Sequence, residues 1–404
     1  MESNNGTNDL PEQKVKRRIL LLRHICVTFL AVAIVGFFAF VTITVKPLDP
    51  IKRTIEEFSF ADIYYELQRE GVPDTCRSIT IVDITNLISR KDIAKTLVDI
   101  EKHHPKVVGV DCVFEVIGED LEGNDSLISV ANTYKNIVYA ETMDCWENDS
   151  IGWTSCTHSF FADVTDITEG TVNVSRALYD NMKRKASVSE TYNGKQELSF
   201  VTQLANHYSD TAIIEAERTD EIQINFTTTY FQVLQPDEVA AHPELIEDHI
   251  VLFGATSSIN DLHWTPLGRI PGIELHAYAL QSIIQSKEIR DVKFVPFCLI
   301  SLLVIFLVQV MQSVYIKRTR HSKNMFVKHI VGSSYILNIL TFLFTSVFIG
   351  GCFFVFAIFN ISFNLGWALS AIAFLGTSRS LYASIKEYVN SKKDKYKFLN
   401  GINL

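Results

Sequence analysis

Acidic side chains that could do chemistry follow apolar stretches in the middle of the 404-residue chain. Asp83 lies in SITIVDI and Asp111 lies in VVGVDCVF. Both stretches are predicted parallel strands, and open α/β sheets place their ligand crevice at the carboxyl ends of such strands. Two carboxylates there would bind a cation or a cationic ligand, or act as acid and base. The favoured interpretation is that each aspartate caps the helix that follows it and needs no ligand.

A second group of polar side chains lies after an apolar strand and at the start of the last predicted helix. It consists of Asp261, His263, Thr265 and His276. These residue types can ligate zinc or form a hydrolytic relay. However, the sequence contains no H-E-x-x-H and no G-x-S-x-G motif. Since buried polar groups need hydrogen-bond partners, a structural cluster is the favoured interpretation.

The loop around this group also offers a place for a ligand. Backbone N–H groups in Gly254–Gly268 would suit a small anion or a polar molecule. We therefore keep six candidate ligand-binding residues, and we predict no catalytic residue, no metal ligand and no cofactor. The six are Asp83, Asp111, Asp261, His263, Thr265 and His276.

Cysteine spacing allows one disulfide. Cys145 and Cys156 flank a polar stretch, WENDSIGWTS, that can close a hairpin, and an exported compartment would permit the bond. This pair is a disulfide candidate, with two free thiols as the equal alternative. The sequence has no C-x-x-C motif, so the spacing gives no support to a zinc site or a thioredoxin-type redox centre.

Alternating strand and helix patterns must position these side chains. The first four elements are a strand at 78–84, a helix at 93–103, a strand at 107–114 and a helix at 121–134. Further strands are expected at 136–141, 222–226 and 249–254, and further helices at 198–208 and 272–285. Alternation of strand and helix implies a parallel sheet, and continuously apolar strands imply that both of its faces are covered. The prediction is one α/β domain with a mostly parallel sheet over residues 46–292.

Long apolar runs lie on either side of this domain, at Ile19–Val45, Phe294–Ile316 and Ile330–Thr377. A membrane-spanning helix needs roughly 20 apolar residues, so the third run can hold two helices with a turn at Asn360–Asn364. The first run is too long for a signal peptide and no cleavage site follows it, so it should be an uncleaved anchor. The prediction is four transmembrane helices, at 19–45, 293–316, 330–358 and 362–380.

Charge indicates the orientation of these helices. Residues 46–292 hold 41 of the 46 acidic residues and 20 of the 37 basic residues, a net charge of −21 that argues against nucleic-acid binding. Basic residues outside this segment gather at Lys14–Arg23, Lys317–Lys328 and Arg379–Lys397. The positive-inside rule then predicts that the tail 1–18, the loop 317–329 and the tail 381–404 are cytoplasmic, with residues 46–292 outside.

Three stretches of the chain carry a family resemblance. They are FSFADIYYEL with SITIVDI, then HHPKVVGVDCVFE, and then HIVLFGATSSINDLHWTPLGRIPGIELHAYALQSII at His249–Ile284. In these stretches the chain resembles the CHASE2 family of extracytoplasmic sensor domains from bacterial signalling receptors, nearly position by position in the third. The family's usual topology is one membrane helix before the domain and three after it. The stretch NLISRKD after Ile84 departs from the family, which has a Trp-Pro-Trp-like sequence there.

The resemblance implies a sensor in the bacterial cytoplasmic membrane that binds an unknown small ligand or protein outside the cytoplasm. About 25 residues follow the last expected helix, too few for an output domain, so we expect the signal to reach a separate cytoplasmic signalling protein. One alternative is a membrane scaffold that recruits partner proteins. A less favoured alternative is a membrane-bound enzyme that uses Asp261, His263 and His276. A homodimer is expected by family analogy alone.

Overall fold

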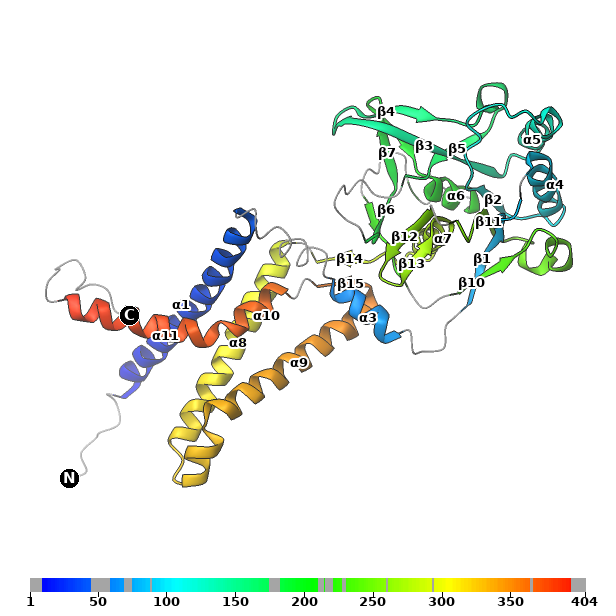
Figure 1. Cartoon of the computed structure of the whole chain (residues 1–404). Helices are drawn as coiled ribbons and strands as arrows, with labels where there is room; N and C mark the ends of the chain where they lie inside the picture. The colour runs from blue at the N-terminus through cyan, green and yellow to red at the C-terminus, as the bar shows by residue number, and fades with distance from the viewer. Residues whose placement is uncertain are drawn as a thin grey trace, which may run out of the picture. The chain divides into compact units, whose positions relative to one another are not determined.

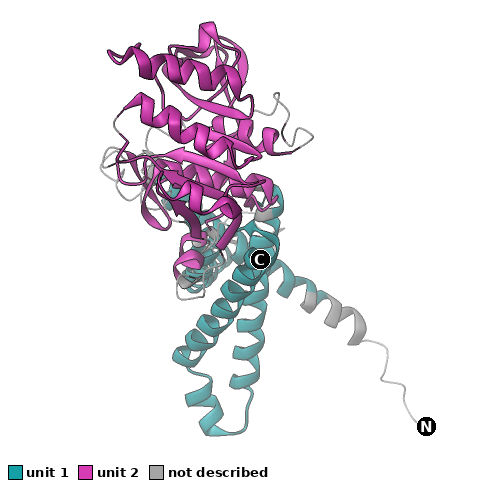
Figure 2. Cartoon of the chain, turned by 90° about the vertical axis from the view of Figure 1, so that its right-hand side faces the viewer, with its two compact units in different colours: residues 1–60, 291–404 teal, residues 61–290 magenta. Residues whose placement is uncertain are grey.

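The chain divides into two compact units, residues 1–60 with 291–404 and residues 61–290 (Figure 2). The computed structural model describes residues 9–44, 59–68, 75–87, 89–173, 182–209, 214, 221–226, 230–258, 261–292, 294–363 and 366–393. The expected start of the outer domain at residue 46 lies outside the described residues.

Strands and helices alternate from residue 75 to residue 148, as the sequence patterns predict, whereas the described residues of 137–198 form six strands with no α-helix between them (Figure 1). The helices are α3 (Phe60–Gln68), α4 (Arg90–Glu101), α5 (Leu121–Thr133), α6 (Phe200–Tyr208) and α7 (Gly272–Ile284). The first strands are β1 (Thr75–Asp83), β2 (Val107–Val110), β3 (Ile137–Asn148), β4 (Gly152–Thr157), β5 (Thr168–Thr171), β6 (Lys185–Ser187) and β7 (Ser189–Tyr192). The remaining strands are β8 (Lys195–Leu198), β9 (Glu221–Gln223), β10 (Tyr230–Leu234), β11 (Ile250–Gly254), β12 (Leu262–Thr265), β13 (Gly268–Pro271) and β14 (Arg290–Asp291).

Among the described residues, a nine-stranded and mostly parallel sheet forms the centre of this unit, which confirms the predicted α/β class. Its parallel part runs in the order β10, β1, β11, β2, β3, and β5 is also parallel to β3. β4 is antiparallel to β3, and β8 is antiparallel to β7. An isolated bridge links β8 back to β5. It joins Ser199, the residue directly after β8, to Thr171 at the end of β5.

Helices cover both faces of the parallel strands (Figure 1). On one face, Val82 packs in a core with Leu97 of α4 and Leu127 of α5. On the other face, α6 lies so close to β2 that a Cβ atom at Gly109 would meet Leu204 Cδ1 at 2.8 Å. Covering on both faces explains why every residue of β2 and β11 is buried and apolar or glycine.

The other unit is helical. Its elements are α1 (Asp9–Thr44), α8 (Phe294–Arg320), a π-helical turn at Val327–Val331, α9 (Ser334–Phe359), the short strand β15 (Ile361–Ser362), α10 (Gly366–Ala373) and α11 (Leu375–Lys393). Three segments of the described chain are long and apolar enough to cross a membrane, at Arg18–Val41, Cys298–Arg320 and Ser334–Phe359. Asn360 ends α9 in a left-handed conformation with φ of 53°, at the start of the predicted turn.

The prediction of a fourth long apolar helix at 362–380 is wrong. Two helices, α10 and α11, occupy this region and are separated at Phe374. The apolar run that begins at Gly366 ends at Gly376 and is followed by TSRS, so it falls well short of the roughly 20 residues that a span needs. Instead, Ala371 and Ile372 of α10 pack in one apolar core with residues of α1 and α8.

Candidate functional site

Strand register places two predicted site residues at one edge of the sheet. Asp83, the last residue of β1, is in register with Gly254, the last residue of β11. On the other side of β11, Phe253 pairs with Val110, so Asp111 comes next to Gly254. Neighbouring strands lie about 4.8 Å apart. The two aspartates therefore flank Gly254 at the carboxyl edge of the sheet, where open α/β sheets bind ligands.

Asp83 is fixed by the hydrogen bonds that its carboxylate accepts. Its Oδ1 accepts from the Thr85 N–H at 3.0 Å, the Thr85 hydroxyl at 2.6 Å and the Thr256 N–H at 3.0 Å. Burial by itself would raise the pKa of Asp83, but these hydrogen bonds outweigh it and lower the pKa to about 2. The carboxylate thus joins the loops that follow β1 and β11. It does not cap α4, whose N-cap is Ser89, so the helix-capping prediction is wrong for Asp83.

Asp111 differs from Asp83, because no described residue forms a hydrogen bond with its carboxylate. Burial raises the pKa of Asp111; the imidazoles of His276 and His263 oppose this rise, and the Asp261 carboxylate adds to it. The helix that follows, α5, is capped by Asp120, so the capping prediction is wrong for Asp111 as well.

Asp261 precedes β12, His263 lies in it, and the two side chains form a pair. His263 Nε2 is 3.1 Å from Asp261 Oδ1, and the side chains are 28% and 45% exposed. The Asp261 carboxylate also lies against the first residue of α7, since a Cβ atom on Gly272 would be 2.6 Å from Asp261 Oδ2. A carboxylate at this end of a helix is stabilised by the helix dipole. Asp261 is therefore held between an imidazole and the N-terminus of α7.

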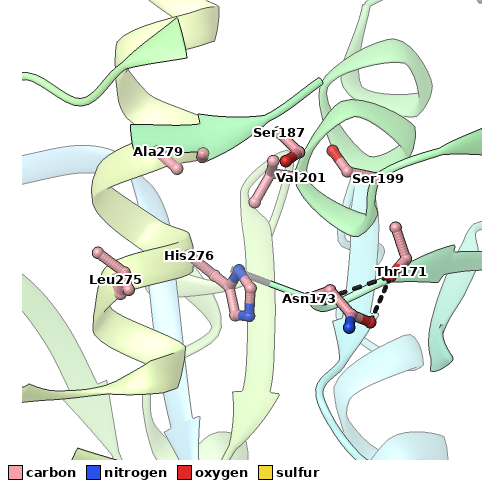
Figure 3. Close-up of a pocket in the computed structure, with 9 residues that line it drawn as sticks. Thr171, Asn173, Ser187, Ser199, Val201, Leu275, His276 and Ala279 are labelled. Carbon is pink, nitrogen blue, oxygen red and sulfur yellow. Dashed lines mark hydrogen bonds between the residues drawn. The ribbon is translucent and has the colours of Figure 1, made fainter. Parts of the chain in front are cut away.

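His276 projects from the second turn of α7 into a pocket (Figure 3). The pocket is small: its empty space of about 270 Å³ includes open solvent, and its interior has room for about one water molecule. Its lining also includes Thr171, Asn173, Ser187, Ser199 and Leu275. The imidazole meets the ring of Phe200 edge-on, with the ring centroids 5.5 Å apart. Burial lowers the pKa of His276, whereas the charges of Asp111 and Asp261 oppose the shift.

The structure thus brings four of the six candidate residues within electrostatic range of one another. This Asp111 cluster consists of Asp111, Asp261, His263 and His276. Asp83 is instead engaged in its two loops. The Thr265 hydroxyl donates to the Gly268 carbonyl at 2.9 Å and accepts from the Leu267 N–H at 3.2 Å, which closes the turn between β12 and β13.

Most of the chain matches one known family. The profile of the CHASE2 domain matches residues 29–311, which include all six candidate residues. The chain belongs to the CHASE2 family. This result confirms the resemblance drawn from three short stretches of sequence, and the family is one of sensor domains. No curated protein and no solved structure matches the chain.

Both cysteines of the disulfide candidate in the CHASE2 domain are free thiols. In the β3–β4 hairpin, Cys156 pairs with Met143, whereas Cys145 lies two residues further along β3, with φ of 60°. The Cys156 Sγ lies 3.5 Å from Glu141 Oε2. The strand register therefore offsets the two cysteines from each other, and the structure does not contain the disulfide that the sequence allowed.

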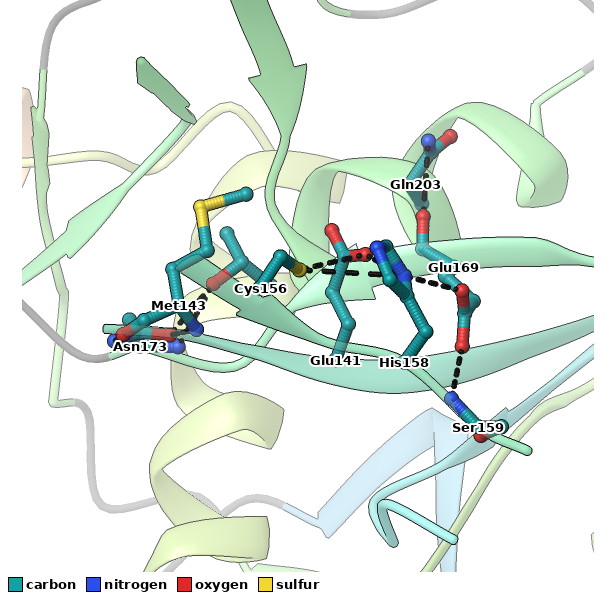
Figure 4. Close-up of polar contacts among 9 residues, drawn as sticks. Glu141, Met143, Cys156, His158, Ser159, Glu169, Asn173 and Gln203 are labelled. Carbon is teal, nitrogen blue, oxygen red and sulfur yellow. Dashed lines mark hydrogen bonds and ion pairs between the residues drawn. The ribbon is translucent and has the colours of Figure 1, made fainter. Parts of the chain in front are cut away.

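A further group of polar side chains in the CHASE2 domain was missed by the sequence analysis (Figure 4). Glu141 of β3, Cys156 of β4, His158 just after β4 and Glu169 of β5 lie close together. Their spacing in the sequence matches no ligand motif, because strand pairing brings them together and local spacing does not. The C-x-H spacing of Cys156 and His158 was the one local signal of this group.

The hydrogen-bonded state of Asp83 gives a testable pH dependence of stability. Its pKa falls from 3.8 to about 2. The ionised carboxylate therefore stabilises the fold above about pH 4, and this contribution is lost as the pH falls toward 2. We expect Asp83→Asn to lower the free energy of unfolding by about 2 kcal/mol at pH 7, and by less at pH 3.

Thermal unfolding of the purified full chain at both pH values measures this difference. Asp163→Asn is the control, because Asp163 is an exposed acid in the same unit. An equal loss of stability for Asp83→Asn at pH 7 and pH 3 would show that the hydrogen-bonded carboxylate is not the cause.

Proposed function

We propose that this CHASE2 protein is a membrane-anchored sensor that binds a small cationic ligand at the Asp111 cluster. The observation that carries the proposal is the Asp111 carboxylate, to which no described residue supplies a hydrogen bond. A partly buried carboxylate that receives no hydrogen bond from the described residues is costly, and a bound cation would offset that cost. The position supports the proposal too, because Asp111 lies at the carboxyl edge of parallel strands.

The charges of the cluster favour a cation over an anion. Burial lowers the pKa of His276 and thereby favours its neutral form. The cluster also contains two carboxylates, Asp111 and Asp261, which an anion would have to approach. An ammonium or guanidinium group would donate charge-assisted hydrogen bonds to them, which are stronger than bonds between neutral groups.

We propose that the signal passes through α1 and α8. These membrane helices come before and after the CHASE2 domain in the chain. Val27 and Ala31 of α1 pack in one apolar core with Val308 of α8. Within this contact, the Thr28 hydroxyl donates to Gln309 Oε1 at 2.9 Å. A ligand that binds one arrangement of the domain more tightly than another would shift the balance between arrangements of these helices. We propose that a separate cytoplasmic signalling protein reads this shift.

We propose that the CHASE2 domain lies outside the cytoplasmic membrane of a bacterium. The support is the distribution of charge, since the domain segment is acidic while Lys14–Arg23 and Lys317–Lys328 are basic. The same argument assigns the loop after α8 to the cytoplasm. We expect this loop to be where the separate signalling protein binds, because its lysine and arginine side chains are exposed.

Labelling of Cys145 tests the orientation. Cys145 is a free and exposed thiol of the domain. A membrane-impermeant maleimide should therefore label the wild type in intact spheroplasts but should not label Cys145→Ser. A cysteine introduced by Ser322→Cys in the basic loop should react only after the membrane is permeabilised. Labelling with the opposite pattern would reverse the proposed orientation.

A panel of organic cations tests the ligand class. Thermal unfolding of the full chain in detergent is followed with polyamines, basic amino acids and quaternary amines. A ligand at 100 times its Kd stabilises by about 2.7 kcal/mol, so at least one cation should raise the Tm of the wild type. Asp111→Asn should abolish the rise, whereas Asp163→Asn should keep it. An equal rise in Asp111→Asn, or rises with anions only, would contradict a cationic ligand at this cluster.

A crosslinking pulldown tests the cytoplasmic partner and the scaffold alternative. The full chain should capture a cytoplasmic signalling enzyme, and Lys323→Glu with Lys328→Glu should lose it because both lysines are exposed on the basic loop. Lys195→Glu on β8 is the matched charge-reversal control and should retain the enzyme. Capture of outer-compartment proteins alone, regardless of the loop charge, would favour a scaffold and contradict the sensor.

A further inference from the structure

Two carboxylates, a thiol and an imidazole meet between β3, β4 and β5 (Figure 4). We call this set the Glu141 cluster; it consists of Glu141, Cys156, His158 and Glu169. His158 Nδ1 lies 2.8 Å from Glu169 Oε2 and 3.1 Å from Glu141 Oε2. Cys156 Sγ lies 3.5 Å from Glu141 Oε2 and 4.0 Å from His158 Nδ1. Ligand atoms of Glu141, Cys156 and His158 therefore all lie within 4.8 Å of one another, and Glu169 joins them through its contact with His158.

Strand pairing fixes this convergence. Thr142 pairs with Thr157 across β3 and β4, so Glu141 and His158 come next along the same pair of strands. Cys156 lies two residues before His158, on the same side of its strand. Glu169 arrives from β5, which pairs in parallel with the first half of β3. Its other carboxylate oxygen accepts from the Ser159 N–H at 2.9 Å, which orients the side chain.

The cluster has more acceptor atoms than protons to share among them. Nδ1 of His158 can carry one hydrogen, yet carboxylates approach this nitrogen from two sides. The carboxylates are also desolvated, since the side chains of Glu141 and Glu169 are 9% and 11% exposed. Burial raises the pKa of Glu141, and the nearby charge of Glu169 raises it further. A cation at the centre would relieve this repulsion.

We propose that Glu141, Cys156 and His158 form a binding site for a zinc-class transition-metal ion, with Glu169 beside it in contact with His158. Zinc takes carboxylate oxygen and imidazole nitrogen at roughly 2.0–2.2 Å and thiolate sulfur at about 2.3 Å in tetrahedral sites, which places ligand atoms about 3.4–3.6 Å apart. The separations of 3.1–4.0 Å among Glu141, Cys156 and His158 bracket this value. Small side-chain movements would complete the site.

Metal binding would change the protonation of the cluster without any redox step. The Cys156 S–H bond breaks, its proton goes to solvent, and the thiolate forms the metal–sulfur bond. His158 binds through the lone pair of Nδ1 and keeps its hydrogen on Nε2. A Cys145–Cys156 disulfide would remove the thiolate, so disulfide formation and metal binding exclude each other.

The site would act separately from the Asp111 cluster. Its ligands come from β3, from β4 and from the residue directly after β4, so a bound ion would tie this antiparallel pair together beside the parallel strand β5. The inference does not rest on the proposed sensor function, because no residue of the Asp111 cluster takes part in it. Metal binding is also testable without knowing the sensor ligand.

Cobalt and zinc titrations of the metal-free full chain in detergent test the site. We expect one Co²⁺ per chain, with a thiolate-to-cobalt charge-transfer band and the visible bands of tetrahedral cobalt. Zn²⁺ should displace the cobalt and raise the Tm. Cys156→Ser should abolish the charge-transfer band. Glu141→Gln and His158→Gln should each weaken zinc affinity at least about tenfold, the lower end of losses seen even for residues that only support metal ligands.

Matched controls separate this site from incidental binding. His242→Gln removes a histidine of equal exposure, 46% against 47%, that also contacts a glutamate at 3.1 Å; it should leave affinity unchanged. Cys145→Ser removes the other thiol of the hairpin and should keep the charge-transfer band. Absence of stoichiometric cobalt binding to the reduced wild type would overturn the proposal. So would binding that survives Cys156→Ser and His158→Gln but is lost in His263→Gln, because the ion would then lie at the Asp111 cluster.

Discussion

The close approach of α7 to the sheet at Gly254 is the constraint on which the Asp111 cluster depends. A Cβ atom on Gly254 would lie 2.8 Å from Ile273 Cδ1 and 3.1 Å from Asp111 Cβ, so only glycine fits without displacement. Because the first turn of α7 rests there, its N-terminus lies against the Asp261 carboxylate, and His276 comes within electrostatic range of Asp111. A larger residue at this position would have to displace the Ile273 side chain and Asp111.

Burial shifts the acid and the base of the cluster toward their neutral forms. The pKa of Asp111 is raised and that of His276 is lowered, with desolvation as the largest cause in both cases. Asp83 flanks Gly254 on the side opposite to Asp111. The pKa of Asp83 is lowered, because hydrogen bonds from its two loops outweigh burial. One edge of the sheet thus holds an aspartate that is hydrogen-bonded to its own loops and an aspartate to which no described residue donates a hydrogen bond. The hydrogen-bond donors around each carboxylate make the difference.

The two polar clusters of the CHASE2 domain lie on different kinds of secondary structure. The Asp111 cluster is built at the ends of parallel strands and on α7, whereas the Glu141 cluster is built where β3 exchanges a parallel neighbour for an antiparallel one. Loops and helix ends can rearrange more readily than paired strands, so the first location suits a responsive site and the second suits a rigid one. This difference agrees with the proposed ligand site at the first cluster and the proposed ion site at the second.

The sequence by itself determined the alternation from β1 to β3, helices α4 to α7, three long apolar helices and the family, because these follow from local apolar patterns and from residues close together in the chain. It did not predict strands β4 to β8. It overestimated the last apolar run, since a helix break at Phe374 lies inside it. Only the tertiary structure decided that Asp83 belongs to two loops and that Asp111 joins His276. It also decided that Glu141, Cys156, His158 and Glu169 lie close together. The physical reason is strand register and helix docking, which join segments far apart in sequence and leave no trace in local spacing.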